Sequence, residues 1–331
     1  MKIKTSAAIL IANLFLVSAS ASAQTEASAF NLPHNPPVVD VSGAKKVSEG
    51  ITIIPDSKRT NYVPNIGIIE GSDAILVIDT GMGSANGGKV YTYAQKVANG
   101  RKIYVTTTHF HPEHAFGVSA FKNAVYVANR KQAKEIDEKS EAYLAMFRNF
   151  GSVEKEALKD TVIARPTVIY DNTMTIDLGG KQAELIEMPA HTQGDQVIFV
   201  DGAVFLGDLV ENRFYPIMPD ADAHGEKWIK VLNDVLAHKP SISVPGHGDL
   251  SDASLIKEVR DYLIDARDLV AAAVHEGKTQ DQALKELTPK LKALHPDWDN
   301  SVFIPYQISV FYAEQSGKEL KLPDLLKDMQ K

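Results

Sequence analysis

Short apolar runs separated by turn residues dominate the chain from residue 48 to residue 250. The run 67–81 predicts two strands joined by a Gly-Ser-Asp turn, and the run 196–208 predicts a second hairpin that turns at Asp-Gly. The runs 102–109 and 242–248 predict two further strands, the second ending in a glycine turn. These patterns indicate a core built largely from β-strands.

Helical patterns alternate with these strands and suggest a weak internal repeat. The segment 87–99 precedes the strand at 102–109, and the segment 225–240 precedes the strand at 242–248. Each half runs from a hairpin through an aspartate and a helix to a strand and a histidine. These four residues are Asp79, His109, Asp208 and His247. Two similar α/β halves that face each other would bring these strand ends to one edge, where ligands commonly bind.

The β signal disappears beyond Asp249, and amphipathic patterns replace it. Four helical segments are expected there, at 254–277, 279–291, 303–317 and 323–331. We therefore expect a main α/β domain at 48–250 and a helical extension at 251–331. A charged helical insertion is expected at 129–160.

The first residues read as a processing segment. Lys2 and Lys4 precede the apolar run 7–17, and Ala21-Ser22-Ala23 follows as a cleavage pattern. This order predicts a signal peptide at 1–23 that is cut after Ala23, and therefore a periplasmic or secreted protein. The alternative is an uncleaved anchor, but the run is shorter than the ~20 residues that a spanning helix needs. No stable membrane insertion is expected after cleavage, and residues 24–47 are expected to form a flexible lead-in.

Charge and cysteine content narrow the functional classes. The formal net charge is −7 and no basic stripe occurs, so nucleic acid is not an expected partner. The chain has no cysteine, so it forms no disulfide and offers no thiolate to a metal. Any metal ligands must come from His, Asp and Glu, which suit zinc, iron or manganese.

The stretch 106–117, "TTTHFHPEHAFG", holds the densest set of candidate ligands. An H-x-H pair alone is weak evidence for a metal site, because alternating histidines often lie on a solvated strand face. Three more residues strengthen it, because each follows a strand at a loop junction, from which a rigid strand can aim a side chain into a shared cleft. The full candidate set is His109, His111, Glu113, His114, His191, Asp208 and His247.

This constellation resembles the metallo-β-lactamase-fold hydrolase superfamily over roughly residues 48–250. The resemblance implies a four-layer αβ/βα sandwich that holds two zinc ions, with iron and manganese as alternatives. It also implies that a hydroxide bridging the metals attacks a carbonyl substrate. By the same resemblance, His109, His111 and His191 would hold one metal, and Glu113, His114 and His247 the other. Asp208 would bridge the two and, with Glu113, count as catalytic.

Glu113 departs from the family pattern, which usually has Asp at this position. Its carboxylate would lie about an ångström further out, a shift that can alter catalytic geometry. Glu113 could bind the second metal from a displaced backbone, which we favour. It could instead bind only transiently, or serve as a base or a hydrogen-bond partner of a ligand.

The resemblance implies a small-molecule hydrolase, but it does not fix the substrate. Export and the histidine set favour β-lactamase-like hydrolysis of a cyclic amide, of either narrow or broad specificity. Against this, a bridging Asp208 is commoner in lactonase-like members, so a lactonase or esterase is the alternative. An exported accessory metal-binding protein without lactam activity, or a redox iron site, would belong to other functional classes.

Overall fold

The computed structural model describes residues 36–56, 58–59 and 62–323, and two β-sheets form its centre. The first sheet has seven strands, which lie in chain order. They are β1 (Lys45–Ser48), β2 (Ile51–Ile54), β3 (Ile66–Glu70), β4 (Ala74–Ile78), β5 (Lys102–Thr106), β6 (Val125–Asn129) and β7 (Val168–Tyr170). Strands β1 to β4 pair antiparallel, whereas β4 to β7 pair parallel.

The second sheet has five strands in the order β12-β11-β10-β9-β8. They are β8 (Thr173–Asp177), β9 (Gln182–Glu187), β10 (Gln196–Val200), β11 (Ala203–Gly207) and β12 (Ile242–Pro245). Only β11 and β12 pair parallel. The helices are α1 (Gly83–Ala98), α2 (Pro112–Ala115), α3 (Arg130–Arg148), α4 (Ser152–Ala157), α5 (Gly225–Ala237), α6 (Ala253–His275), α7 (Gln280–Leu294) and α8 (Ile304–Ser316).

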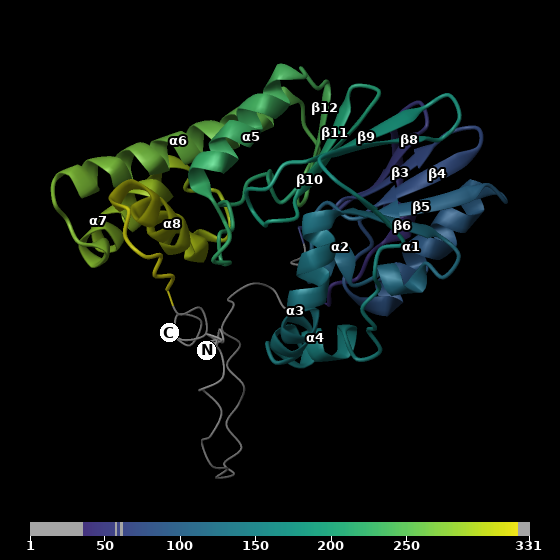
Figure 1. Ribbon diagram of the computed structural model, residues 1–331, viewed down its shortest axis with the longest axis horizontal. Coiled ribbons are helices and arrows are strands. Elements are labelled where there is room, and N and C mark those ends of the chain that lie inside the picture. Colours follow the sequence, from purple (N-terminus) through teal and green to yellow (C-terminus); the bar gives the residue numbers. More distant parts are fainter. Residues whose placement is uncertain (1–35, 57, 60–61, 324–331) are drawn as a thin grey trace, which may run out of the picture.

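The two sheets pack face to face, and helices cover both outer faces (Figure 1). Strand β4 illustrates this layering. All of its residues are buried, and alternate side chains pack into apolar cores on opposite faces of the sheet. Leu76 and Ile78 join the core between the sheets, whereas Ile75 and Val77 pack with α1 and α3. Helices α5 and α6 cover the second sheet. The four-layer αβ/βα sandwich expected from the sequence is confirmed.

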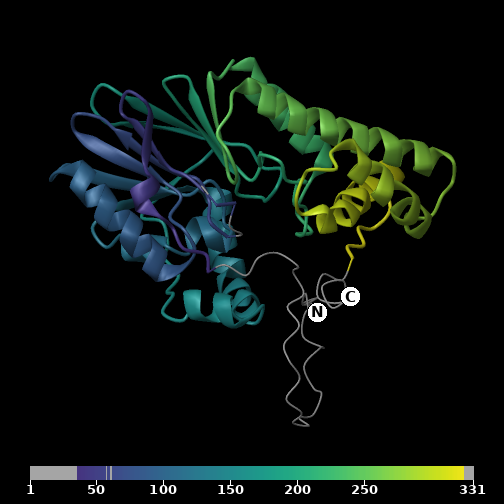
Figure 2. The same ribbon diagram turned by 180° about the vertical axis from the view of Figure 1, so that it is seen from behind.

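Helices α6 to α8 extend from one end of the sandwich, as both views show (Figures 1 and 2). Their apolar faces share one core with the outer face of the second sheet and with α5, where Trp228 is fully buried. Among the described residues, no helix is long and apolar enough to span a membrane. Residues 324–331, part of the last expected helical segment, lie outside the described residues.

The lead-in expected at 24–47 is wrong in its described part. Residues 36–47 include a 3-10 helix at Val41–Gly43 and most of β1, which pairs with β2. Val39 is buried, and its N–H donates to Asn86 Oδ1 at 3.0 Å. The pattern missed this because one edge strand and one buried side chain leave little periodicity. The predicted signal peptide and residues 24–35 lie outside the described residues.

Candidate metal centre

Four strand ends deliver the candidate residues to one edge of the sandwich. Strand β5 ends at Thr106, and the loop behind it carries His109 and His111. Helix α2 then begins with Pro112, whose fixed φ suits a first helical turn, and presents Glu113 and His114. The other three residues each follow a strand of the second sheet. They are His191 after β9, Asp208 after β11 and His247 after β12.

The structure brings all seven candidate residues together. They form two groups of four, and within each group the potential ligand atoms lie within 4.8 Å of one another. The first group is His109, His111, His191 and Asp208, and the second is Glu113, His114, Asp208 and His247. All seven are buried, with exposed fractions of 9% or less. Helix α2 therefore presents Glu113 within reach of the second group despite its extra methylene.

Asp208 belongs to both groups, and each of its oxygens faces one of them. Its Oδ2 lies 3.6 Å from His109 Nε2 and 3.9 Å from His191 Nε2. Its Oδ1 lies 3.2 Å from His114 Nε2 and 3.6 Å from His247 Nε2. A carboxylate in this position can contact two cations at once.

The polar atoms at the centre fit divalent cations. Within the described part of the chain, His109 Nε2, His114 Nε2, Asp208 Oδ1 and Glu113 Oε2 are buried without a hydrogen-bond partner. Leaving such groups unsatisfied costs about 1–3 kcal/mol each, and more for charged groups. Imidazole and carboxylate ligands are those that zinc accepts. The seven residues therefore form a candidate centre for a divalent metal pair.

Hydrogen bonds behind the histidines fix which ring nitrogen faces the centre. His191 Nδ1 donates to Ile217 O at 2.8 Å, and His247 Nδ1 donates to Val63 O at 3.0 Å. Because carbonyl oxygens only accept, the Nε2 atoms of both rings keep free lone pairs for a metal.

Asp79 orients the ring of His114 in the same way, from behind Nδ1. Its Oδ2 lies 2.9 Å from His114 Nδ1, and its Oδ1 accepts a hydrogen bond from the Thr108 N–H at 2.7 Å. Asp79 also has a left-handed φ of 65° at the end of β4. Asp79 therefore supports a candidate ligand from the point where β4 ends.

His111 is oriented the other way round. Its Nδ1 faces the centre, 3.1 Å from His191 Nε2, and its Nε2 lies 3.4 Å from Asp220 Oδ2. Burial lowers the pKa of His111, but the bond to Asp220 and its charge outweigh this and raise the pKa to about 9. Asp220 also accepts a hydrogen bond from Tyr143, so α3 supports His111 through this aspartate.

Burial keeps two of the other imidazoles neutral. It lowers the pKa of His109 well below its usual value and that of His191 to about 4. Neutral imidazole is the form that binds metals. Burial opposes the charge of Asp208, yet the surrounding histidines, His114 first, hold the pKa of its carboxyl well below the usual range.

Sequence reasoning missed three acidic residues around the centre. Asp220 supports His111, and Asp195 accepts hydrogen bonds from the Ala190, His191 and Thr192 N–H groups at 2.7–3.0 Å. Glu211 is 4% exposed. Asp195 could have been found, because it follows His191 by four residues in "HTQGD". Asp220 and Glu211 lie in an irregular loop without a local signal.

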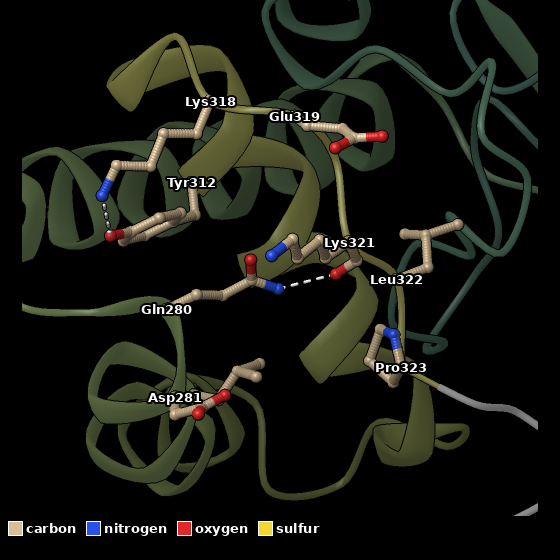
Figure 3. Close-up of a pocket in the computed structure, with 9 residues that line it drawn as sticks. Gln280, Asp281, Tyr312, Lys318, Glu319, Lys321, Leu322 and Pro323 are labelled. Atoms are coloured by element: carbon tan, nitrogen blue, oxygen red, sulfur yellow. Dashed lines mark hydrogen bonds between the residues drawn. The ribbon is translucent and has the colours of Figure 1, made fainter.

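A separate hollow of about 600 Å³ lies in the helical extension (Figure 3). Residues of α7, α8 and the segment up to Pro323 line it, and none of the seven candidate ligands is among them. Its charged residues Asp281, Lys318, Glu319 and Lys321 are exposed and mixed in sign. Nothing there resembles the buried, unsatisfied set at the strand ends.

Comparisons with known proteins agree with this geometry. The human acyl-coenzyme A thioesterase MBLAC2 is 27% identical over 217 residues, which cover 55% of this chain and 72% of the relative. A linear primary-alkylsulfatase from Pseudomonas is 22% identical over 69% of this chain and 51% of its own length. The structure of a metallo-beta-lactamase from Pontibacter korlensis aligns with a TM-score of 0.55 at 20% identity, over 67% of this chain and 98% of that one.

A family model matches residues 59–247, which is more than half of the chain and spans all seven candidate ligands. The chain belongs to the metallo-beta-lactamase superfamily.

Proposed function

We propose that this protein is a dinuclear zinc hydrolase that cleaves an ester-type bond at a carbonyl carbon. The observation that carries the proposal is the position of Asp208, whose two oxygens each face one group of potential ligands. Zinc ions bound there would lower the pKa of a bound water towards ~7 and polarise the carbonyl of the substrate.

The side chains of this protein supply the geometry that such chemistry needs. Asp208 would hold both cations, because each of its oxygens faces one group of candidate ligands. The bonds from His191 to Ile217 O and from His247 to Val63 O hold the imidazoles in one orientation. Because both rings are also buried, little reorganisation is required when a substrate binds.

The relatives support an ester-type substrate. According to their names, the thioesterase cleaves an acyl thioester, whose reacting carbon is a carbonyl, and the alkylsulfatase cleaves a sulfate ester, which has no carbonyl. The bridging aspartate also favours this class over lactams, as argued from the sequence. An acyl ester or thioester is therefore our first candidate.

Hydrolysis of a β-lactam is the second candidate. The ligand set is free of cysteine, as in one subclass of these enzymes that the sequence resembles. The Pontibacter structure supports only the shared fold, because its identity to this chain is 20%. We also propose export after cleavage at Ala23, which N-terminal sequencing of protein from the periplasmic fraction would test.

The deciding experiment measures metal content and turnover on the same preparation. We expect about two zinc ions per chain by mass spectrometry, and hydrolysis of p-nitrophenyl esters or acyl thioesters that a chelator abolishes and zinc restores. A lactone, a chromogenic β-lactam and an alkyl sulfate complete the panel, and preferential turnover of the β-lactam would select the second candidate.

Two histidine variants provide the matched comparison. His111→Ala should lose metal and activity, whereas His238→Ala should keep both, because His238 stacks on Phe199 away from the centre. A zinc-loaded wild type that hydrolyses no substrate of the panel would contradict the proposal.

A further inference from the structure

Glu211 lies in the loop that begins at Asp208, and it belongs to neither four-residue group of candidate ligands. It follows Asp208 by three residues, in a loop that is bonded to the loop carrying His247. The Gly246 N–H donates to Val210 O at 3.0 Å, and the Asn212 N–H donates to His247 O at 3.0 Å. The backbone on both sides of Glu211 is thereby fixed against the His247 loop.

The carboxyl group of Glu211 is buried and incompletely satisfied. The residue is 4% exposed, and its Oε2 has no hydrogen-bond partner among the described residues. The same is true of Glu113 Oε2 and Asp208 Oδ1. A buried carboxylate without a partner is strongly unfavourable, so such a group needs a cation, a donor or a proton.

The electrostatic neighbours of Glu211 point to the second metal position. Burial first, and then the negative charges of Asp208 and Glu113, raise the pKa of Glu211 well above its usual value, whereas the charge of His114 lowers it. All three belong to the second group of ligands. The two negative neighbours disfavour the ionised form of Glu211 in the metal-free protein. A cation between the carboxylates would favour that form.

Charge balance leads to the same conclusion. Two divalent cations bring four positive charges into a buried site, of which Asp208 and Glu113 offset two. A third carboxylate next to the second position would offset one more. Histidine ligands cannot do this, because they bind metals in their neutral form.

We propose that Glu211 is a positioning residue for the second metal ion, and that its carboxylate strengthens cation binding there from just outside the four close ligands. This inference rests on the proposed dinuclear centre. The second metal position would then have three carboxylates, those of Asp208, Glu113 and Glu211. The first metal position has only Asp208.

The test compares Glu211→Gln with Glu154→Gln. Glu154 in α4 is a matched control, because it is 6% exposed and its Oε2 also lacks a hydrogen-bond partner in the described residues, but it belongs to neither ligand group.

Zinc is titrated into the metal-free proteins in competition with a chromophoric chelator. We expect Glu211→Gln to weaken the second zinc equivalent about tenfold or more, as removal of a group that supports a ligand typically does. The first equivalent should stay within about twofold, and the control should leave both unchanged.

Thermal unfolding of the metal-free proteins gives a second, independent readout. Glu211→Gln removes an unpaired buried acid, so its metal-free melting temperature should be equal to or higher than that of the wild type. A purely structural role would lower it and leave zinc affinity unchanged, and that result would overturn the inference. A wild type that binds two zinc ions, with the second equally tight in Glu211→Gln, would overturn this inference alone. A wild type that binds a single ion would overturn the dinuclear proposal as well.

Discussion

At the candidate metal centre, burial and neighbouring charges have opposite effects on the ionisation of single side chains. Asp208 is 3% exposed, yet it stays ionised because the imidazoles of His109, His114 and His247 surround it. Those rings are in turn held from behind, for example by Asp79 and by Val63 O. A change of one atom at the centre should therefore alter metal binding more than the stability of the fold.

Shortening Glu113 to Asp tests whether this residue binds the second ion. The glutamate oxygen lies within 4.8 Å of the other candidate ligand atoms of its group, and an aspartate on the same backbone would move the carboxylate by about an ångström. We expect Glu113→Asp to weaken the second zinc equivalent about tenfold. The first equivalent should not change, as competitive zinc titration would measure. Unchanged second binding would argue that Glu113 is not a ligand, and tighter binding would show that the expected direction is wrong.

Asp79→Asn tests the support of His114. The variant removes the negative charge that faces His114 Nδ1, and it should lower affinity for the second zinc by about 10–100-fold. Asp73→Asn serves as the control, because Asp73 is exposed in the turn before β4 and accepts a side-chain bond only from its neighbour Ser72 in the described residues. Equal zinc binding in both variants would argue against a role for Asp79.

The sequence indicated the candidate ligands more clearly than the groups behind them. His109, His111 and His114 stand close together in the chain, and His247 lies in a recognisable glycine turn. Asp220 reaches His111 only because a loop folds back across 109 residues of chain. Contacts of that kind leave no local pattern, so they required the structure.

At the scale of elements, the junctions after β11 and β12 determine how the second sheet meets the centre. Gly207 has a φ of 52°, and the Gly246 N–H donates to Gly207 O at 2.8 Å. This close approach lets Asp208 and His247 face the same space. A Cβ at Gly246 would lie 2.0 Å from Asp208 Oδ1, so no larger residue fits without moving the carboxylate.

Gly246→Ala should therefore damage the metal centre. We expect weaker binding of both zinc equivalents, because Asp208 serves both groups, and calorimetric titration would measure this. Gly88→Ala is the control, since nothing lies within 4 Å of a Cβ there and the residue is inside α1. It should leave zinc binding intact and stabilise the fold by up to ~1 kcal/mol. Full zinc affinity in Gly246→Ala would contradict the role of this close approach.

Elements with strong apolar patterns were predicted, and weakly patterned ones were not. Strands β3, β4, β10 and β11 have buried runs and clear turns, so both hairpins were found. Strand β1 is exposed or half-buried throughout, and β7 has only three residues. Their positions follow from pairing with neighbouring strands, which a local pattern cannot show.

At the scale of the whole molecule, the helical extension is part of the core of the second layer rather than a separate unit. Helix α6 packs against α5, α8 and β12. Helix α8 also meets the start of α5, where Glu314 accepts a hydrogen bond from the Glu226 N–H at 3.2 Å and lies 3.7 Å from His224 Nδ1. This contact links the extension to the sandwich through a titratable group.

Burial, with a contribution from Glu226, raises the pKa of Glu314 to about 6. The folded state therefore binds this proton more tightly than the unfolded state, in which the pKa of Glu314 is near 4.5. Stability should fall as pH rises from about 4.5 through 6, and then level off. Glu314→Gln should be more stable than the wild type above pH 6, by roughly 1–2 kcal/mol, and similar to it at pH 4. Urea unfolding at both pH values would measure this, and an equal difference at pH 4 and pH 8 would contradict it.

The candidate ligands come from both halves of the chain. His109 to His114 belong to the first sheet, whereas His191, Asp208 and His247 belong to the second. Any ion that they share would act as a cross-link across the sandwich, tying together segments 80 or more residues apart in the sequence. Removing it should make the two sheets easier to shear against each other, although the apolar core between them and the strand pairing of each sheet would remain.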